Sequence, residues 1–187
     1  MVGELHLIVG PMFSGKTTSL LSKIVLMADI GRKCLYVNYR WDNRVDCQTD
    51  GTVSTHHSRF ASLPSTITSR KVMTLSELSV DDFQVIGVDE AQFFPDIDSI
   101  TSWVASGKIV YVSALDGDYK RRPFDGVLSL IPECDSVVKQ VAYCRPCLDR
   151  GLYVQAPFTR RIALSGERIL IGGSESYIPV CRGCLTE

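Results

Sequence analysis

The chain has 187 residues, of which 45% are hydrophobic and 22% are charged, and these proportions exclude a disordered chain. Domains average roughly 150 residues, so we expect one full domain with a small addition. The formal net charge of −1 argues against broad electrostatic binding to nucleic acid or to an anionic membrane. No apolar stretch approaches the ~20 residues that span a bilayer, and the N-terminus has no basic, apolar leader, so we expect a cytoplasmic protein.

Up to about residue 141 the sequence predicts alternating strands and helices. Short apolar runs predict strands at 5–9, 34–37, 85–88 and 109–112. Apolar residues at helical spacing predict a helix over 16–29 that ends before a left-handed Gly31, and Pro95-Asp96 predicts the start of a helix that runs to about Gly107. Because strands that alternate with helices are joined by crossovers, we expect an α/β fold with a mostly parallel sheet.

Two regions depart from this alternation. The segment 42–62 is polar and rich in Ser and Thr, and we interpret it as a long, mobile connection of the kind that often carries function. After about residue 141 the composition changes to cysteine pairs, Gly172-Gly173 and a short β-like run at 158–164. We therefore predict two parts, an α/β domain over 1–141 and a small β-rich lobe over 142–187.

A phosphate-binding motif follows the first predicted strand and opens the first predicted helix, which is the context that the motif requires. Backbone N–H groups of such a loop and the positive end of the helix dipole hold phosphates. Lys16 can reach the β- and γ-phosphates, and the Thr17 hydroxyl can ligate Mg²⁺. The motif predicts a fold like that of P-loop NTPases; the alternative is an ordinary turn before a helix. It matches G-x-x-x-x-G-K-[ST] at Gly10, Pro11, Met12, Phe13, Ser14, Gly15, Lys16 and Thr17.

A pair of acids ends the predicted strand at 85–88. Ligands of open α/β sheets bind at the carboxyl ends of the strands, so Asp89 is placed to hold Mg²⁺, directly or through water. Glu90 is a second carboxylate beside it, pointing to a different side, and is a candidate general base toward a hydroxyl or water. The alternative for Glu90 is a solvated loop carboxylate or a helix cap.

Five segments in this order resemble the type II thymidine kinases, a compact family of animals, bacteria and large DNA viruses: GPMFSGKT, DEAQFFPDI, SALDGDYKRRPF, CRPC and IGGSESYIPVCRGC. The resemblance covers nearly the whole chain. It implies an enzyme of nucleoside salvage that transfers the γ-phosphoryl group of ATP to the 5′-hydroxyl of thymidine, with Mg²⁺ as cofactor. It also implies inhibition by thymidine triphosphate and assembly into tetramers, or dimers, through the α/β domains.

The resemblance implies the roles of the residues around ATP. Gly10 to Thr17 would hold its phosphates, and Glu90 would take the proton from the thymidine hydroxyl. The element Asp42-Asn43-Arg44 would place Arg44 near the transferring phosphoryl group, a task that suits a planar, bidentate donor. Gln92 would belong to the network around substrate and phosphates. A solvated loop arginine remains the alternative for Arg44.

The resemblance also implies a pocket for the thymine base. A loop that we call the lasso, residues 170–177, would close over the nucleoside, and its glycines would let backbone groups approach the thymine edge. Without the resemblance, the apolar members of this set would be interpreted as core residues. The implied residues are Met12, Phe93, Leu115, Tyr119, Phe124 and Thr159, with Leu170, Ile171, Gly172 and Tyr177 from the lasso.

Two Cys-x-x-Cys pairs, Cys144 with Cys147 and Cys181 with Cys184, predict a structural zinc site near the C-terminus. Four thiolates around Zn²⁺ form a closed tetrahedron with no open position for catalysis. The 33 residues between the pairs exceed the usual ribbon spacing, which the resemblance explains because the lasso lies between them. Two buried turns or a redox pair are the alternatives.

A different class of function stays open beside the kinase. A P-loop ATPase or switch could use its zinc lobe to bind nucleic acid or a protein partner, with Glu90 activating water. A basic stripe and stacking aromatics on the lobe would favour that hypothesis, and the sequence shows neither. We therefore favour the thymidine kinase, with thymidine and ATP as partners and neither nucleic acid nor membrane.

Overall fold

A parallel β-sheet forms the centre of the computed structural model, which describes residues 2–40, 63–164, 170 and 172–185. The strand order is β3-β2-β4-β5-β1-β6, and every neighbouring pair is parallel. The strands are β1 (Glu4–Gly10), β2 (Cys34–Tyr39), β3 (Ile67–Val72), β4 (Val85–Val88), β5 (Ile109–Leu115) and β6 (Ser136–Lys139). The expectation of an α/β fold with a mostly parallel sheet is confirmed.

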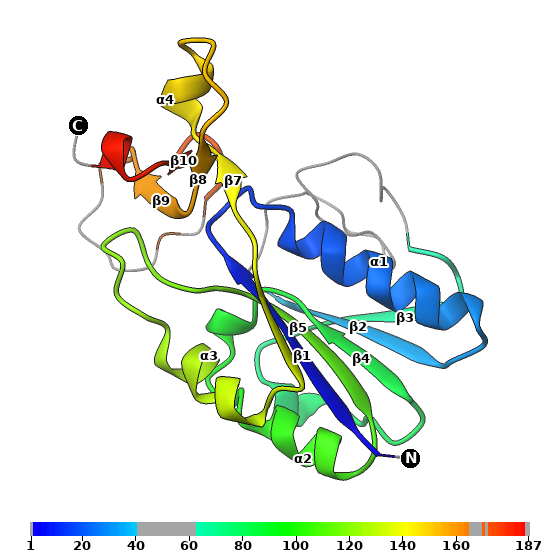
Figure 1. The fold of residues 1–187 in the computed structure, drawn as a ribbon. Helices are drawn as coiled ribbons and strands as arrows, with labels where there is room; N and C mark the ends of the chain where they lie inside the picture. Colours follow the sequence, from blue (N-terminus) through cyan, green and yellow to red (C-terminus); the bar gives the residue numbers. More distant parts are fainter. Residues whose placement is uncertain (1, 41–62, 165–169, 171, 186–187) are drawn as a thin grey trace.

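Helices cover both faces of this sheet (Figure 1). Helix α1 (Lys16–Asp29) lies on one face, and α2 (Ser99–Ala105) and α3 (Asp125–Ser129) lie on the other. Short 3₁₀ turns stand at Leu75–Glu77, Ala91–Phe93, Ile131–Glu133 and Gly183–Leu185. The described helices include none that is both long and apolar enough to cross a membrane.

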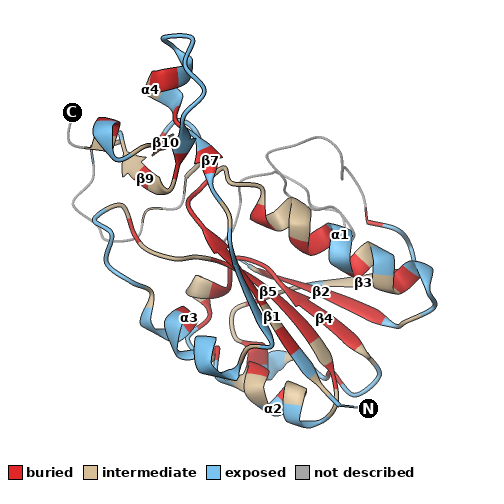
Figure 2. Cartoon of the chain, viewed as in Figure 1, coloured by how far each residue is buried: buried red, intermediate tan, exposed pale blue. Residues whose placement is uncertain are grey.

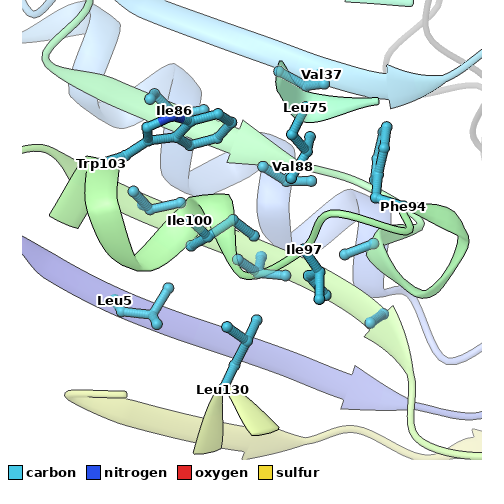
Figure 3. Packing of buried hydrophobic residues seen from close by; sticks show 14 of the residues in the cluster. Leu5, Val37, Leu75, Ile86, Val88, Phe94, Ile97, Ile100, Trp103 and Leu130 are labelled. Atoms are coloured by element: carbon cyan, nitrogen blue, oxygen red, sulfur yellow. The ribbon is translucent and has the colours of Figure 1, made fainter. Parts of the chain in front are cut away.

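The core divides into two layers because strand side chains alternate between the faces. Leu5 and Leu7 of β1 belong to the cluster on the α2 face, which also contains Ile100 and Trp103 of α2. Figure 3 shows part of this cluster. On the other face Ile8 packs against α1. Most residues of the inner strands are buried (Figure 2), as both faces of a parallel sheet are covered.

Helix α1 approaches the sheet closely at Gly87, in the middle of β4. A methyl group on Gly87 would overlap Cδ1 of Ile24. Glycine therefore fits here because the helix side chain occupies the space of the missing Cβ, and this contact sets the height of α1 above the strand.

The predicted helix over 95–107 begins later than the sequence suggests. Pro95 to Asp98 form turns, and α2 begins at Ser99. The Asp96 carboxylate accepts the backbone N–H groups of Leu75 and Ser76, at 2.9 and 2.8 Å, instead of capping its own helix. Since tertiary hydrogen bonds hold this residue, the proline does not mark the first turn.

Both outer strands of the sheet are absent from the sequence interpretation. Strand β3 is apolar only at its two ends, Ile67 and Val72, and all four residues of β6 are exposed. Neither is the continuous apolar run that marks an inner strand of a parallel sheet, and each is identified only by its pairing, with β2 and with β1 respectively.

The residues after 141 have a small core of their own. Two short antiparallel pairs and one helical turn surround buried Ala142, Ala156 and Val180 and the cysteines, and Phe13 of the phosphate-binding loop packs against this cluster. The division at 141 and 142 stays a prediction. The elements are β7 (Ala142–Tyr143), α4 (Arg145–Leu148), β8 (Gln155–Ala156), β9 (Phe158–Arg161) and β10 (Tyr177–Val180).

Candidate functional site

The phosphate-binding motif forms a tight loop between β1 and α1. The Pro11 carbonyl accepts hydrogen bonds from Ser14 Oγ, at 2.9 Å, and from Lys16 Nζ, at 2.7 Å, and these curl the loop. Gly15 has the left-handed φ of +81° that lets the chain enter α1 directly. The first turn of α1 carries no acidic side chain, so its N–H groups and dipole favour an anion.

Asp89 lies fully buried at the end of β4. Its carboxylate accepts hydrogen bonds from Thr17 Oγ1 at 3.2 Å, from Tyr36 OH at 2.9 Å, from Ser113 Oγ, and from the Glu90 N–H at 3.0 Å. Burial, and after it the charge of Glu90, raise the pKa of Asp89 to about 6, although the hydroxyl bonds from Ser113, Tyr36 and Thr17 act in the opposite direction. A cation beside this carboxylate would restore its charged form.

The donor set around Asp89 fits the magnesium ion that the motif implies. Mg²⁺ prefers oxygen ligands and keeps several waters. The Thr17 hydroxyl and the Asp89 carboxylate supply two oxygens within hydrogen-bond distance, at the positive end of α1 where triphosphate oxygens would complete the shell. Nothing in this pair suits a softer metal.

Glu90 is held in place rather than solvated. Its residue exposure is 9%, and its backbone has a left-handed φ of +51° at the start of the 3₁₀ turn η3 (Ala91–Phe93). Gln92 Nε2 donates to Glu90 Oε2 at 2.6 Å, while Gln92 Oε1 accepts the Leu115 N–H at 2.9 Å. Gln92 therefore links the Glu90 carboxylate to the end of β5. The family resemblance assigns Glu90 and Gln92 to the surroundings of the substrate.

A cavity of about 740 Å³ joins these groups. Glu90 and Leu115 line it together with Lys16 and Thr17, so a carboxylate and the phosphate loop open into one space. Its volume lies within the usual range for small-molecule sites. The other lining residues are Met12, Phe13, Gly15, Thr18, Ala142, Tyr143, Arg145, Leu148, Ser174, Tyr177, Ile178 and Pro179.

The C-terminal lobe is fixed to the phosphate loop. The Met12 N–H donates to Thr159 Oγ1 of β9 at 3.0 Å, and both residues are buried. Tyr177 of β10 lines the cavity, and its OH donates to the Leu170 carbonyl at 2.7 Å. Gly172 packs so closely on Ser176 that a Cβ would lie 2.5 Å from Ser176 Oγ. These contacts hold the described part of the lasso beside the loop.

Three aromatic residues of the predicted base pocket do not line this cavity. Phe93 packs on Tyr39 with ring centroids 5.5 Å apart, and Phe124 lines a second cavity, of about 470 Å³, that Gln92 also borders. Tyr119 lies under the Arg161 guanidinium, 4.0 Å from its ring centroid. Asp42, Asn43, Arg44 and Ile171 lie outside the described residues.

The sequence interpretation missed three side chains of the site. Tyr36 and Ser113 reach Asp89 from β2 and β5, the two neighbours of β4, so only the strand order reveals them. Arg161 links the loop after β5 to the lasso, because it stacks on Tyr119 and donates to Tyr177 OH at 2.7 Å. Its place in the β-like run at 158–164 gave no signal of this.

The four predicted zinc ligands come together in the lobe. The sulfurs of Cys144, Cys147, Cys181 and Cys184 all lie within 4.8 Å of one another. Burial, and after it hydrogen bonds with the other three thiols, raise the pKa of the Cys184 thiol to about 12. Thiols so close cannot all ionise without a cation, and four sulfurs in this arrangement suit tetrahedral Zn²⁺. The residues present therefore fit the implied metal.

Comparison with known proteins agrees with this geometry. The sequence model described as Thymidine kinase matches residues 3–185. The chain belongs to the thymidine kinase family. Its relatives include the thymidine kinases of Monkeypox virus and of Vaccinia virus strain Western Reserve, each 40% identical over 183 residues, which cover 97% of this chain and 96% of the relative. Thymidine kinase 1 of Dictyostelium discoideum is 36% identical over 187 residues, 98% of this chain and 78% of its own.

Membership of the thymidine kinase family confirms the resemblance that the five sequence segments suggested. It also accounts for the coarse plan of the site, since kinases of this family take ATP and a metal ion. The roles of the single residues remain predictions that the geometry supports.

The first prediction concerns the pH dependence of folding. Between about pH 4 and pH 6 folded Asp89 keeps a proton that the unfolded chain has lost, so the folded protein without divalent cations loses stability as pH rises through this window. Replacing Asp89 by Asn removes this loss. We expect the stability of Asp89→Asn relative to the unmodified protein to rise by up to about 3 kcal/mol from pH 4 to pH 7, measured by urea unfolding.

Asp82→Asn, at an exposed acid, is the control for the loss of one negative charge. A stability difference between Asp89→Asn and the unmodified protein that stays constant over this pH range would contradict the buried-acid interpretation.

The second prediction concerns the cysteine cluster. The purified protein should contain one zinc ion per chain, and chelation should lower the melting temperature by about 5 °C or more, because the lobe has only a small apolar core. Cys184→Ser should lose the metal, whereas Cys134→Ser, outside the cluster, should keep it. Equal melting temperatures with and without zinc would exclude a structural site.

Proposed function

We propose that the protein transfers the γ-phosphoryl group of ATP to the 5′-hydroxyl of thymidine. One observation carries this proposal: the buried Glu90 carboxylate opens into the same cavity as Lys16 and Thr17 of the phosphate loop. A base and a phosphate-binding loop that share one space suit transfer to an alcohol held between them. The names of the viral and amoebal relatives support thymidine as that alcohol.

In the proposed reaction the 5′-oxygen of thymidine forms a bond to the γ-phosphorus as the bond from that phosphorus to the bridging β,γ-oxygen breaks. ADP leaves, and Glu90 accepts the hydroxyl proton. Gln92 fixes the position of the Glu90 carboxylate. Lys16, the loop N–H groups and the α1 N-terminus hold the phosphates. Mg²⁺, held by Thr17 and Asp89 when bound, would neutralise charge on the phosphate oxygens.

We propose that the nucleoside lies at the end of the cavity formed by Met12, Leu115 and Tyr177, under the lasso. Backbone groups around Leu170 and Gly172 would read the thymine edge, which suits the close packing seen at Gly172. Thr159 holds the amide of Met12 at this end. Phe93, Tyr119, Phe124 and Ile171 stay assigned to the thymine pocket by family resemblance, and Arg44 to the phosphoryl group. Thymidine triphosphate would inhibit because its base and its phosphates fit the two ends of the same cavity.

The decisive assay incubates the protein with ATP, Mg²⁺ and each of the four deoxynucleosides, and identifies any monophosphate formed. We expect thymidine monophosphate, and competition by thymidine triphosphate. Glu90→Gln should lower kcat by about 10²- to 10⁴-fold while ADP binding is retained, because only proton acceptance is lost. Glu133→Gln, at an exposed acid, is the matched control.

Normal turnover of a folded Glu90→Gln variant would contradict the base assignment. Hydrolysis of ATP that does not depend on any nucleoside would favour the ATPase hypothesis, in which Glu90 activates water.

We also propose that the protein forms a homotetramer, or a dimer, in a reducing cytoplasm. The outer strand β6 is exposed along its length and carries half-exposed Val137 and Val138, and such an edge can pair with another copy. Four free thiols grouped for metal suit a reducing compartment. Sedimentation equilibrium at micromolar concentration should give a mass above that of one chain; a monomer would contradict the assembly.

A further inference from the structure

The cavity extends beyond the region assigned to the nucleoside acceptor. Besides Glu90 and Leu115 it is lined by Tyr143, Arg145 and Leu148 of the C-terminal lobe. None of these three belongs to the phosphate loop or to the lasso. Their aromatic, cationic and aliphatic side chains line a part of the cavity that has no role in the proposed phosphoryl transfer.

The strand order places the two sides of the cavity on opposite sides of the phosphate loop. The loop follows β1, which lies between β5 and β6. Glu90 follows β4 and Leu115 ends β5, on one side of β1, while Tyr143 follows β6 on the other side. Since ligands of an open parallel sheet lie across the carboxyl ends of its strands, a ligand on the loop can extend over both sides.

The chain after β6 is fixed against the loop and against α1. Gln140 N–H donates to the Val9 carbonyl at 2.8 Å, and Gln140 Nε2 donates to Ser19 Oγ of α1 at 2.6 Å. A Cβ on Gly10 would lie 2.5 Å from the Gln140 carbonyl oxygen, so a residue with a side chain would separate the two segments. Strand β7, which ends at Tyr143 three residues later, therefore has a set position, and Figure 1 shows it near the start of α1.

The direction of the bound triphosphate follows from the reaction. Its γ-phosphate must face the acceptor hydroxyl near Glu90, and Lys16 reaches the β- and γ-phosphates. The nucleoside end of the donor must then leave the loop past the first turn of α1. Thr18 lines the cavity there, together with Tyr143 and Arg145.

We propose that Tyr143 and Leu148 form the subsite for the purine base of the phosphate donor, an inference that rests on the proposed transfer from ATP. The Tyr143 side chain lies on a short strand, and the residue is 59% exposed toward the cavity and solvent, so its ring is accessible for stacking. Aromatic stacking holds a base without requiring a set of hydrogen bonds. Leu148 adds apolar surface beside it.

Arg145 stands at the rim of this subsite. Its Nε donates to Asp149 Oδ1 at 3.0 Å, one helical turn later, which restrains the guanidinium beside the cavity. Its positive charge near the phosphates attracts a nucleotide, and the stacking surface next to it selects one that carries a base.

The test measures the binding of ADP and of inorganic tripolyphosphate by titration calorimetry in the full-length, zinc-containing protein. Tyr143→Ala should weaken ADP binding by about tenfold, because one stacked base is lost. Its affinity for tripolyphosphate should stay within twofold of the unmodified protein, because the phosphate loop is intact. Tyr143→Phe keeps the ring and should bind ADP like the unmodified protein.

Tyr153→Ala is the matched control, since Tyr153 belongs to the same lobe, is 85% exposed and does not line the cavity. Unchanged ADP affinity in Tyr143→Ala would overturn the proposal, as would an equal loss of affinity for ADP and tripolyphosphate. Neither ligand requires thymidine. If Tyr143→Ala weakens ADP binding but the protein does not phosphorylate thymidine, only the proposed function is contradicted. If the protein phosphorylates thymidine but Tyr143→Ala binds ADP normally, only this subsite is contradicted.

Discussion

A buried negative charge governs the arrangement of this site. Asp89 lies at the end of an inner strand, out of contact with water, and three hydroxyl groups and a backbone amide from four parts of the chain converge on it. Burying a carboxylate is unfavourable unless polar groups or a cation compensate. Thr17 on α1, Tyr36 on β2 and Ser113 on β5 must therefore keep their places around it. Two of these elements, α1 and β5, also line the cavity.

The second part of the site depends on how the cysteine-rich lobe rests on the phosphate loop. Within the loop, Met12 donates its amide to Thr159, and Phe13 packs against the cluster that contains Cys144 and Cys184. The lobe therefore completes the loop from outside. The same lobe carries Tyr177, and with it one side of the cavity, so binding surface and loop support come from a single small unit.

The sequence predicts those features whose residues are neighbours along the chain. The phosphate loop, the acid pair at 89 and 90 and the two cysteine pairs are local patterns, and the described structure brings each together as expected. The inner strands are equally local signals. Residues that act across the sheet give no such signal: Tyr36 and Ser113 are ordinary strand residues until the order of strands is known, and Arg161 is one of several lobe arginines.

The errors of the sequence interpretation have the same cause. Asp96 resembles a residue of a first helical turn, but it binds two backbone amides that are 20 and 21 residues away in the chain. The outer strands β3 and β6 are identified by their hydrogen bonding to β2 and β1, because their composition does not mark them as strands. The assignment of Phe93 and Phe124 to the base pocket is a separate matter and stays a prediction: Phe93 packs on Tyr39, and Phe124 lines the second cavity.

The glycine at position 87 affects the site as well as the core. Ile24 stands two helical turns after Thr17, and Gly87 stands two residues before Asp89. How closely the Ile24 side chain packs over Gly87 therefore affects how near α1 brings the Thr17 hydroxyl to the Asp89 carboxylate. The distance between the Thr17 hydroxyl and the Asp89 carboxylate thus depends on apolar packing inside the molecule, because a side chain at position 87 would displace Ile24 from its place above β4.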